Sequence, residues 1–170
     1  ACGTGINLMR IGKIFPKYKL IGCDWVKPSQ DILARIASQH GLDLTGKLAN
    51  LWTGEGVNAA ELSHGKTGIL TVHGLEQIGT GWGPFFRIVD AMKPEIVVHI
   101  EPIIEMYDPD KLLDSLAIRY HRKRKYLDNF LTEIRARETA GRAEIVATRR
   151  FNFGSSFQEA YTLVVWRPKG

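Results

Sequence analysis

The residues nearest the start of the chain that could do chemistry are a run of small residues, Ala1-Cys2-Gly3-Thr4-Gly5, with the composition of a turn. A glycine-rich turn that leads into a helix lets the backbone approach a ligand closely, and the helix start offers free N–H groups. Asp24 follows about 20 residues later, at the end of the next predicted strand, where an acid can accept hydrogen bonds from both hydroxyls of a ribose. Together these features predict a site for a nucleoside-containing cofactor.

The spacing of the small residues separates two classes of cofactor. The dinucleotide fingerprint G-x-G-x-x-G beginning at Gly3 requires glycine at position 8, which is Leu8, so the pattern does not favour NAD. Ala1, Gly3 and Gly5 instead fall on the small positions of acid-x-Gly-x-Gly-x-Gly, with Ala1 replacing the first glycine. That pattern is the first motif of the class I S-adenosylmethionine-dependent methyltransferases, and Asp24 matches the acid that follows their second strand. The sequence therefore resembles this family.

The resemblance covers nearly the whole chain. Residues 71–78, Thr-Val-His-Gly-Leu-Glu-Gln-Ile, are similar to the family's fourth-strand motif, in which the chain leaves the strand and passes beside the cofactor. The terminal helix and hairpin resemble the part of the family that carries its sixth and seventh strands, whose antiparallel pairing is a hallmark of the sheet. The family's acid or Asn after the third strand has no exact match in this chain: Asn50 lies nearby, and Leu51 or Trp52 is the alternative at that place.

The resemblance implies S-adenosyl-L-methionine as the cofactor and transfer of its methyl group to an oxygen or nitrogen nucleophile. It places the methionine portion against residues 1–5, the ribose against Asp24, and the adenine and reacting end near residues 50–52 and 73–76. Trp25 either stacks on the adenine or covers the sheet edge. The residues expected to contact the cofactor are Ala1, Cys2, Gly3, Thr4, Gly5, Asp24, Trp25, Asn50, Leu51 and His73.

Three residues are candidates for proton transfer: Glu76, His73 and His121. His73 and Glu76 follow a predicted strand at the carboxyl edge, where open α/β sheets bind ligands and a base can take the proton of a hydroxyl or amine. Such a base is not obligatory, because a sulfonium methyl is already activated and alignment supplies much of the rate. His73 is otherwise a cap or a wall of the substrate site. His121 lies in a basic helical segment, where it is either solvated or projects over the site as part of a lid.

Other polar residues have both a ligand-binding and a structural interpretation. Glu101, Glu105 and Tyr107, after the strand expected over 95–100, either meet a cationic or polar substrate or cap and solvate the loop. The five histidines have no spacing with cysteine or acid that would fix a cation, so no metal site is expected.

The elements that must position these residues alternate between helix and strand. We expect helices over 6–14, 30–40 and 82–92, strands over 18–23, 44–51, 67–73 and 95–100, a turn over 24–29, and at most two helical turns within 52–68. Strands over 143–151 and 157–166 are expected to form an antiparallel hairpin across residues 152–156. The pattern predicts an α/β fold: a three-layer Rossmann-like sandwich with a mostly parallel sheet and an antiparallel C-terminal hairpin.

The segment between the last parallel strand and the hairpin is predicted to be helical. Asp108-Pro109 resembles a helix start, with a capping side chain followed by proline at the first helical position. One helix from Pro109 to Glu138 would be about 45 Å long at 1.5 Å per residue, so a kink or two helices is expected.

Residues 1–170 are expected to form a single domain that is incomplete at its amino end. The acid of the first motif and the strand before it would precede Ala1, and the family places that strand in the middle of the sheet. Without it, two strand edges and their backbone groups would be unpaired.

Composition and charge narrow the function classes. With 44% hydrophobic and 24% charged residues, 170 residues suit one ordinary globular domain without a membrane span. Two cysteines are too few for a disulfide framework, which favours the cytoplasm. The net charge of +5 equals the five cations at Arg119, Arg122, Lys123, Arg124 and Lys125, so the basic character is local.

This cationic run predicts a solvated face, a nucleic-acid patch or a site for an anionic substrate. Nucleic acid is disfavoured because Tyr120 and Tyr126 are spaced as core residues and not as stacking platforms. Besides a methyltransferase acting on an unidentified acceptor, two hypotheses remain: a catalytically weak or inactive module that binds a partner or anionic ligand through this basic helix, and a nucleotide-sugar or NAD enzyme of related fold.

Overall fold

The computed structural model of the chain describes residues 1–170 except 64, 152–153, 156–157 and 160. Its α-helices are α1 (Ile6–Ile14), α2 (Lys27–His40), α3 (Ala59–Leu62), α4 (Gly83–Met92), α5 (Leu112–Arg124) and α6 (Phe130–Thr139). Two short 3-10 helices are η1 (Glu76–Ile78) and η2 (Ile104–Met106). The strands are β1 (Leu20–Asp24), β2 (Leu44–Leu48), β3 (Gly68–Val72), β4 (Ile96–Glu101), β5 (Ala143–Arg150), β6 (Gly154–Ser155), β7 (Gln158–Glu159) and β8 (Thr162–Pro168).

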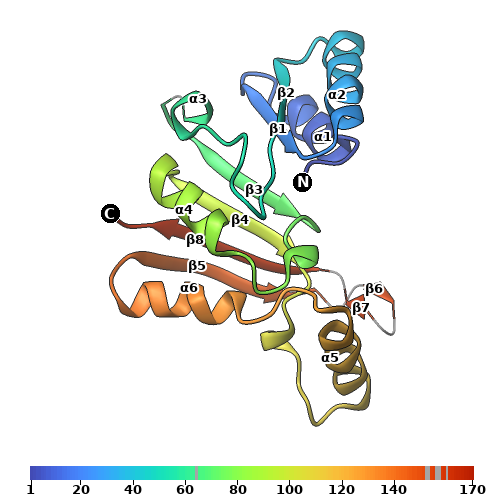
Figure 1. The fold of residues 1–170 in the computed structure, drawn as a ribbon, viewed down its shortest axis with the longest axis vertical. Helices are drawn as coiled ribbons and strands as arrows, with labels where there is room; N and C mark the ends of the chain where they lie inside the picture. The colour runs from blue at the N-terminus through green and yellow to red at the C-terminus, as the bar shows by residue number, and fades with distance from the viewer. Residues whose placement is uncertain (64, 152–153, 156–157, 160) are drawn as a thin grey trace.

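The strands form two main sheets (Figure 1). β1 and β2 pair in parallel, and a second sheet has the order β3-β4-β8-β5, in which β3 and β4 are parallel and β8 is antiparallel to both neighbours. This confirms the predicted α/β fold with parallel strands followed by an antiparallel C-terminal pair. Within the described part of the chain, β2 is the only strand that pairs with β1, and β4 is the only strand that pairs with β3. β1 and β3 therefore each have one edge without a strand.

The larger core lies between the four-stranded sheet and helices α4 and α6. Alternate residues of β4 and β8 face it, and the register pairs Val97 with Trp166, both fully buried. Phe85 and Phe86 of α4 and Phe130 of α6 complete an aromatic cluster on the same face. This packing fixes the position of β4. It thereby also fixes the carboxyl end of the parallel strands.

A smaller core joins β1 and β2 to α1 and α2. Leu20, Leu33 and Leu44 are its buried residues. A Cβ at Gly22 would lie 2.6 Å from Cδ1 of Leu33 and 2.7 Å from Cδ1 of Leu8, so glycine is needed for both helices to approach β1. The helices thereby hold the glycine-rich turn before α1 against the end of β1.

Several boundaries differ from the sequence-based expectations. α2 begins at Lys27, within the expected turn over 24–29, because Pro28 suits a first helical position. β8 begins at Thr162, and residues 152–153 and 156–157 of the expected hairpin lie outside the described residues. The short α3 agrees with the expected one or two turns.

The helix predicted to start at Asp108-Pro109 was wrong, because α5 begins at Leu112. The Asp108 carboxylate accepts a hydrogen bond from the N–H of Asp110, and the backbone N–H of Asp108 donates to the Asp114 carboxylate. The chain therefore forms a turn at Asp108 instead of a helix. Of the expected kink or two helices, the structure has two helices: α5 ends at Arg124 and α6 begins at Phe130. The flanking Lys125 and Asn129 both have a left-handed backbone.

Candidate active site

The turn formed by residues 1–5 is fixed by backbone geometry. Gly3 and Gly5 have φ angles of 53° and 75°, values that favour glycine. The N–H of Cys2 donates to the carbonyl of Cys23 over 2.9 Å, and Gly5 precedes the first turn of α1. Burial raises the pKa of the Cys2 thiol to about 11, so this thiol stays protonated near neutral pH and is no nucleophile.

Asp24, at the end of β1, binds this turn. Its Oδ2 accepts a hydrogen bond from the N–H of Gly3 over 2.8 Å, and its Oδ1 accepts one from the N–H of Val26 over 3.2 Å. The residue is only 4% exposed. The carboxylate predicted to bind ribose therefore also anchors the turn, and its two oxygens retain further lone pairs for a ligand.

The end of β2 lies beside Asp24. The N–H of Ala49 donates to the carbonyl of Asp24, which brings the following Asn50 to the same edge. The Asn50 side chain accepts hydrogen bonds from the N–H groups of Trp52 and Thr53, so it closes its own turn. Leu51 packs against the larger core, whereas Trp25 and Trp52 are 71% and 61% exposed.

A histidine and a glutamate meet at the end of β3. His73 has a φ of 49°, and its Nδ1 lies 2.8 Å from Oε2 of Glu76, which is buried. The Glu101 carboxylate accepts hydrogen bonds from the N–H groups of Gly74 and Leu75 and so holds this tight turn. Burial raises the pKa of Glu101. Glu101 acts as a cap of the turn, which was one of its two expected roles.

The two halves of the predicted site touch each other. A Cβ added to Gly74 would lie 3.0 Å from the Cβ of Ala1. The turn of residues 1–5 therefore contacts the segment that carries His73 and Glu76. Residues separated by some seventy positions in the sequence meet at one edge of the fold.

His121 of α5 lies near Glu76 and not on the surface. It is fully buried, and among the described residues neither of its ring nitrogens has a hydrogen-bond partner. Burial lowers the pKa of His121, and the nearby Glu76 carboxylate opposes that shift. The expectation that His121 is solvated was wrong, because α5 turns this residue inward among the rings of Tyr107, Tyr120 and Tyr126.

The loop after β4 has a structural role at Glu105. Its Oε1 accepts a hydrogen bond from the N–H of Leu131 over 2.8 Å and so caps the first turn of α6. Sequence patterns did not identify Tyr161, whose ring packs edge-on against His73 at 5.0 Å, or Arg150, whose guanidinium lies over the ring of Tyr107. Nothing in their local sequence marks them, since both contacts join distant segments.

The cationic run at the end of α5 is exposed at Arg122, Lys123, Arg124 and Lys125, as expected of a solvated face. The described residues include no group of three or more His, Cys, Asp or Glu side chains that could hold a metal ion. None of the described helices has the length and apolar character needed to cross a membrane.

No family model and no curated protein matches the chain by sequence. Several solved structures share its fold. The methyltransferase domain of bacterial CtHen1-C has a TM-score of 0.60 at 14% identity, over 100% of this chain and 87% of that one. The plantazolicin methyltransferase BpumL, solved with SAH, has a TM-score of 0.57 at 12% identity, over 99% of this chain and 74% of that one.

TehB from Haemophilus influenzae has a TM-score of 0.57 at 13% identity, over 99% of this chain and 56% of that one. The chain spans only 33% of the bifunctional kinase-methyltransferase WbdD. These similarities confirm the expected fold: the chain has the class I methyltransferase fold.

Proposed function

We propose that this protein transfers a methyl group from S-adenosyl-L-methionine to an oxygen or nitrogen nucleophile. The observation that carries the proposal is the contact of Ala1 with Gly74. It joins a glycine-rich turn, an acid at the end of β1 and a His73–Glu76 pair, whose glutamate is buried, at one edge of a methyltransferase fold. The alternative of an inactive module that binds through the basic helix rests only on an exposed cationic run, which is equally typical of a solvated face.

The residues at this edge suit the cofactor. Gly3 would meet no atom within 4 Å even with a Cβ, so the turn is open on that side. The Asp24 carboxylate has lone pairs left for two ribose hydroxyls after it has bound Gly3 and Val26. Trp25 and Trp52 offer exposed rings after β1 and β2 for an adenine. When bound, S-adenosylmethionine supplies a methyl carbon already activated by its sulfonium.

Two imidazoles can accept the proton that the nucleophile loses as it forms its bond to carbon. The Glu76 carboxylate accepts the Nδ1–H of His73, which makes Nε2 the basic nitrogen of that ring. His121 remains neutral to a lower pH than an ordinary histidine because burial lowers its pKa. Both rings are therefore candidates for the general base.

The acceptor is proposed only as a class of nucleophile. The similar structures include a small RNA methyltransferase and the plantazolicin methyltransferase, which differ widely in what they modify. We also propose a cytoplasmic location for the single domain, since Cys2 and Cys23 are both free thiols.

A chemical-shift map of the ¹⁵N-labelled protein tests the site. Addition of S-adenosylhomocysteine is expected to shift the amides of Gly3, Gly5, Val26, Gly74 and Leu75, and adenosine is expected to shift only those near Asp24. NAD is the control for a dinucleotide site. Shifts confined to other regions, or the same map with NAD, would contradict the proposal.

A further inference from the structure

Helix α5 presents a single face to the interior of the molecule. Asp114, Ala117, Ile118 and His121 are its buried residues. Positions 114 and 121 are seven residues apart, so they lie on the same face two turns from each other. Any contact that fixes Asp114 therefore also fixes the rotation of the helix at His121.

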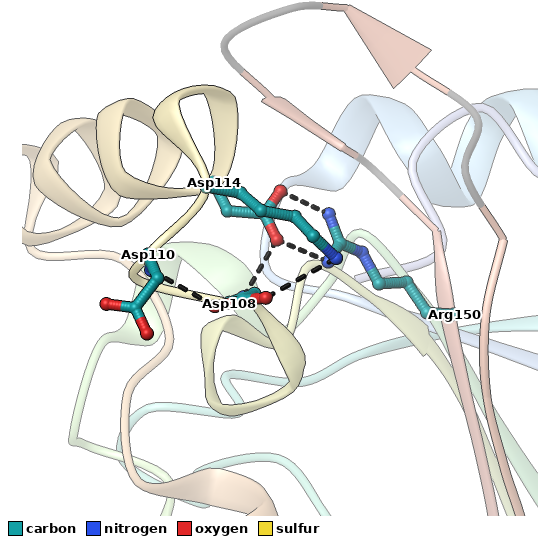
Figure 2. Close-up of polar contacts among 5 residues, drawn as sticks. Asp108, Asp110, Asp114 and Arg150 are labelled. Atoms are coloured by element: carbon teal, nitrogen blue, oxygen red, sulfur yellow. Dashed lines mark hydrogen bonds and ion pairs between the residues drawn. The ribbon is translucent and has the colours of Figure 1, made fainter.

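Arg150, at the end of β5, makes that contact (Figure 2). Its two terminal nitrogens lie 2.6 Å from the two carboxylate oxygens of Asp114, a bidentate geometry. Both side chains are mostly buried, with 21% of Arg150 and 9% of Asp114 exposed. The pairing lowers the pKa of Asp114 to about 2, so this carboxylate stays ionised at neutral pH and the ion pair persists.

The same guanidinium also reaches the surroundings of His121 through an aromatic ring. It lies 4.5 Å from the ring centroid of Tyr107, and the Tyr107 ring packs edge-on against His121 with centroids 6.1 Å apart. The N–H of Asp108 donates to Oδ2 of Asp114, so the loop before α5 is tied to the same carboxylate (Figure 2). Arg150 therefore holds the helix from one side and the wall of the histidine pocket from the other.

We propose that Arg150 is a positioning residue that, through Asp114 and Tyr107, sets the place of the His121 imidazole beside Glu76. This inference rests on the proposed function only for the catalytic use of His121. The placement itself is a property of the folded chain. In this proposal Arg150 acts on His121 through the helix and not on the reacting atoms.

The pKa of the His121 ring depends on the charged and titratable groups that face it. They are Glu76 from η1 with its partner His73, Tyr107 from the loop before α5, Tyr120 on α5, Tyr126 after it, and Arg150 beyond Tyr107. Release of α5 would admit water to the ring and raise the His121 pKa toward its ordinary value.

Two variants distinguish an effect of Arg150 on the position of helix α5 from a direct effect of its charge on the His121 pKa. Arg150→Lys keeps the positive charge and loses the bidentate geometry. Asp114→Asn removes one negative charge beside Arg150, which by charge alone would lower the His121 pKa. Positioning predicts that both variants raise this pKa, by about half a unit or more.

The matched control is Arg137→Lys. Arg137 of α6 is also mostly buried, with 8% of its side chain exposed, and it forms a bidentate pair with Asp90. Its guanidinium lies over the Phe86 ring at 4.2 Å, away from His121. We would follow the His121 ring by NMR against pH in each variant, with a dispersed amide spectrum as the criterion for folding.

The expected result is a raised His121 pKa in both Arg150→Lys and Asp114→Asn and none in Arg137→Lys. An unchanged pKa in the two folded variants, opposite shifts, or an equal shift in Arg137→Lys would overturn the proposal. If the shifts appear as expected but no methyl transfer or S-adenosylhomocysteine binding is found, the positioning stands and the proposed function fails.

Discussion

At the scale of single residues, the histidines differ in the contacts that their rings make. His99 of β4 is fully buried in the larger core between the rings of Phe85 and Phe130. The indole N–H of Trp166 donates to its Nε2, so Nε2 must be the unprotonated nitrogen and the Nδ1–H must donate to Oγ1 of Thr71. His99 is therefore a structural residue with a fixed tautomer.

This arrangement predicts a pH dependence of stability. Burial lowers the pKa of His99 to about 3, whereas in the unfolded chain it titrates near 6.5. Below about pH 6.5 the unfolded chain binds a proton that the folded chain does not, so His99 decreases the free energy of unfolding as the pH falls toward 3. The decrease is at most about 1.4 kcal/mol per pH unit. Urea unfolding at several pH values between 7.5 and 4.5 measures it.

A variant pair isolates the contribution of His99. His99→Gln is expected to be less stable at pH 7.5 but to lose less stability on acidification than the wild-type chain. His40→Gln, at the exposed end of α2, is the control and is expected to keep the wild-type pH dependence. Parallel pH profiles for His99→Gln and the wild type would contradict the assignment.

At the scale of elements, the turn before α1 is the feature most sensitive to substitution. Gly5 has a φ of 75°, and a Cβ there would collide with Cδ2 of Leu33 in α2. Gly141, after α6, has a similar φ of 72° with no atom within 4 Å of the added Cβ. The two glycines therefore separate backbone strain from steric overlap.

Gly141→Ala is expected to destabilise the protein by about 1 kcal/mol through backbone strain. Gly5→Ala is expected to cost about 1–3 kcal/mol more, because the fully buried Leu33 side chain must shift to make room for the added methyl group. Urea midpoints of the two variants measure the difference. Equal losses would show that α1 and α2 do not pack as described.

How much of each element could be predicted depends on how local its cause is. The apolar run of β4 and the proline at the start of α2 are local signals, and the parallel strands, the C-terminal pair and the division into α5 and α6 followed from such signals. The start of α5 did not, because Asp108 binds Asp114 rather than the helix start. The burial of His121 also could not be predicted, since it depends on an ion pair between residues 36 positions apart.

At the scale of the whole molecule, the division of the strands into two sheets is the main feature (Figure 1). The glycine turn lies against both of them, since Cys2 binds Cys23 of β1 and Ala1 touches Gly74 after β3. We propose that a further parallel strand pairs with the open edges of β1 and β3 and joins the two sheets. Such a strand would satisfy backbone groups at both edges and hold the turn more firmly.

The central claim is that the edge formed by the turn, Asp24 and the His73–Glu76 segment binds S-adenosylmethionine. Calorimetric titration with S-adenosylhomocysteine tests it most directly, on the chain as printed and on one with a strand's length of residues ahead of Ala1. Asp24→Ala is the test variant, and Asp31→Ala, an exposed carboxylate of α2, is its control.

We predict micromolar binding of S-adenosylhomocysteine, tighter in the lengthened chain, weakened at least tenfold, about 1.4 kcal/mol, by Asp24→Ala and unaffected by Asp31→Ala. Absence of binding in both chains, or binding that Asp24→Ala leaves unchanged, would contradict the account.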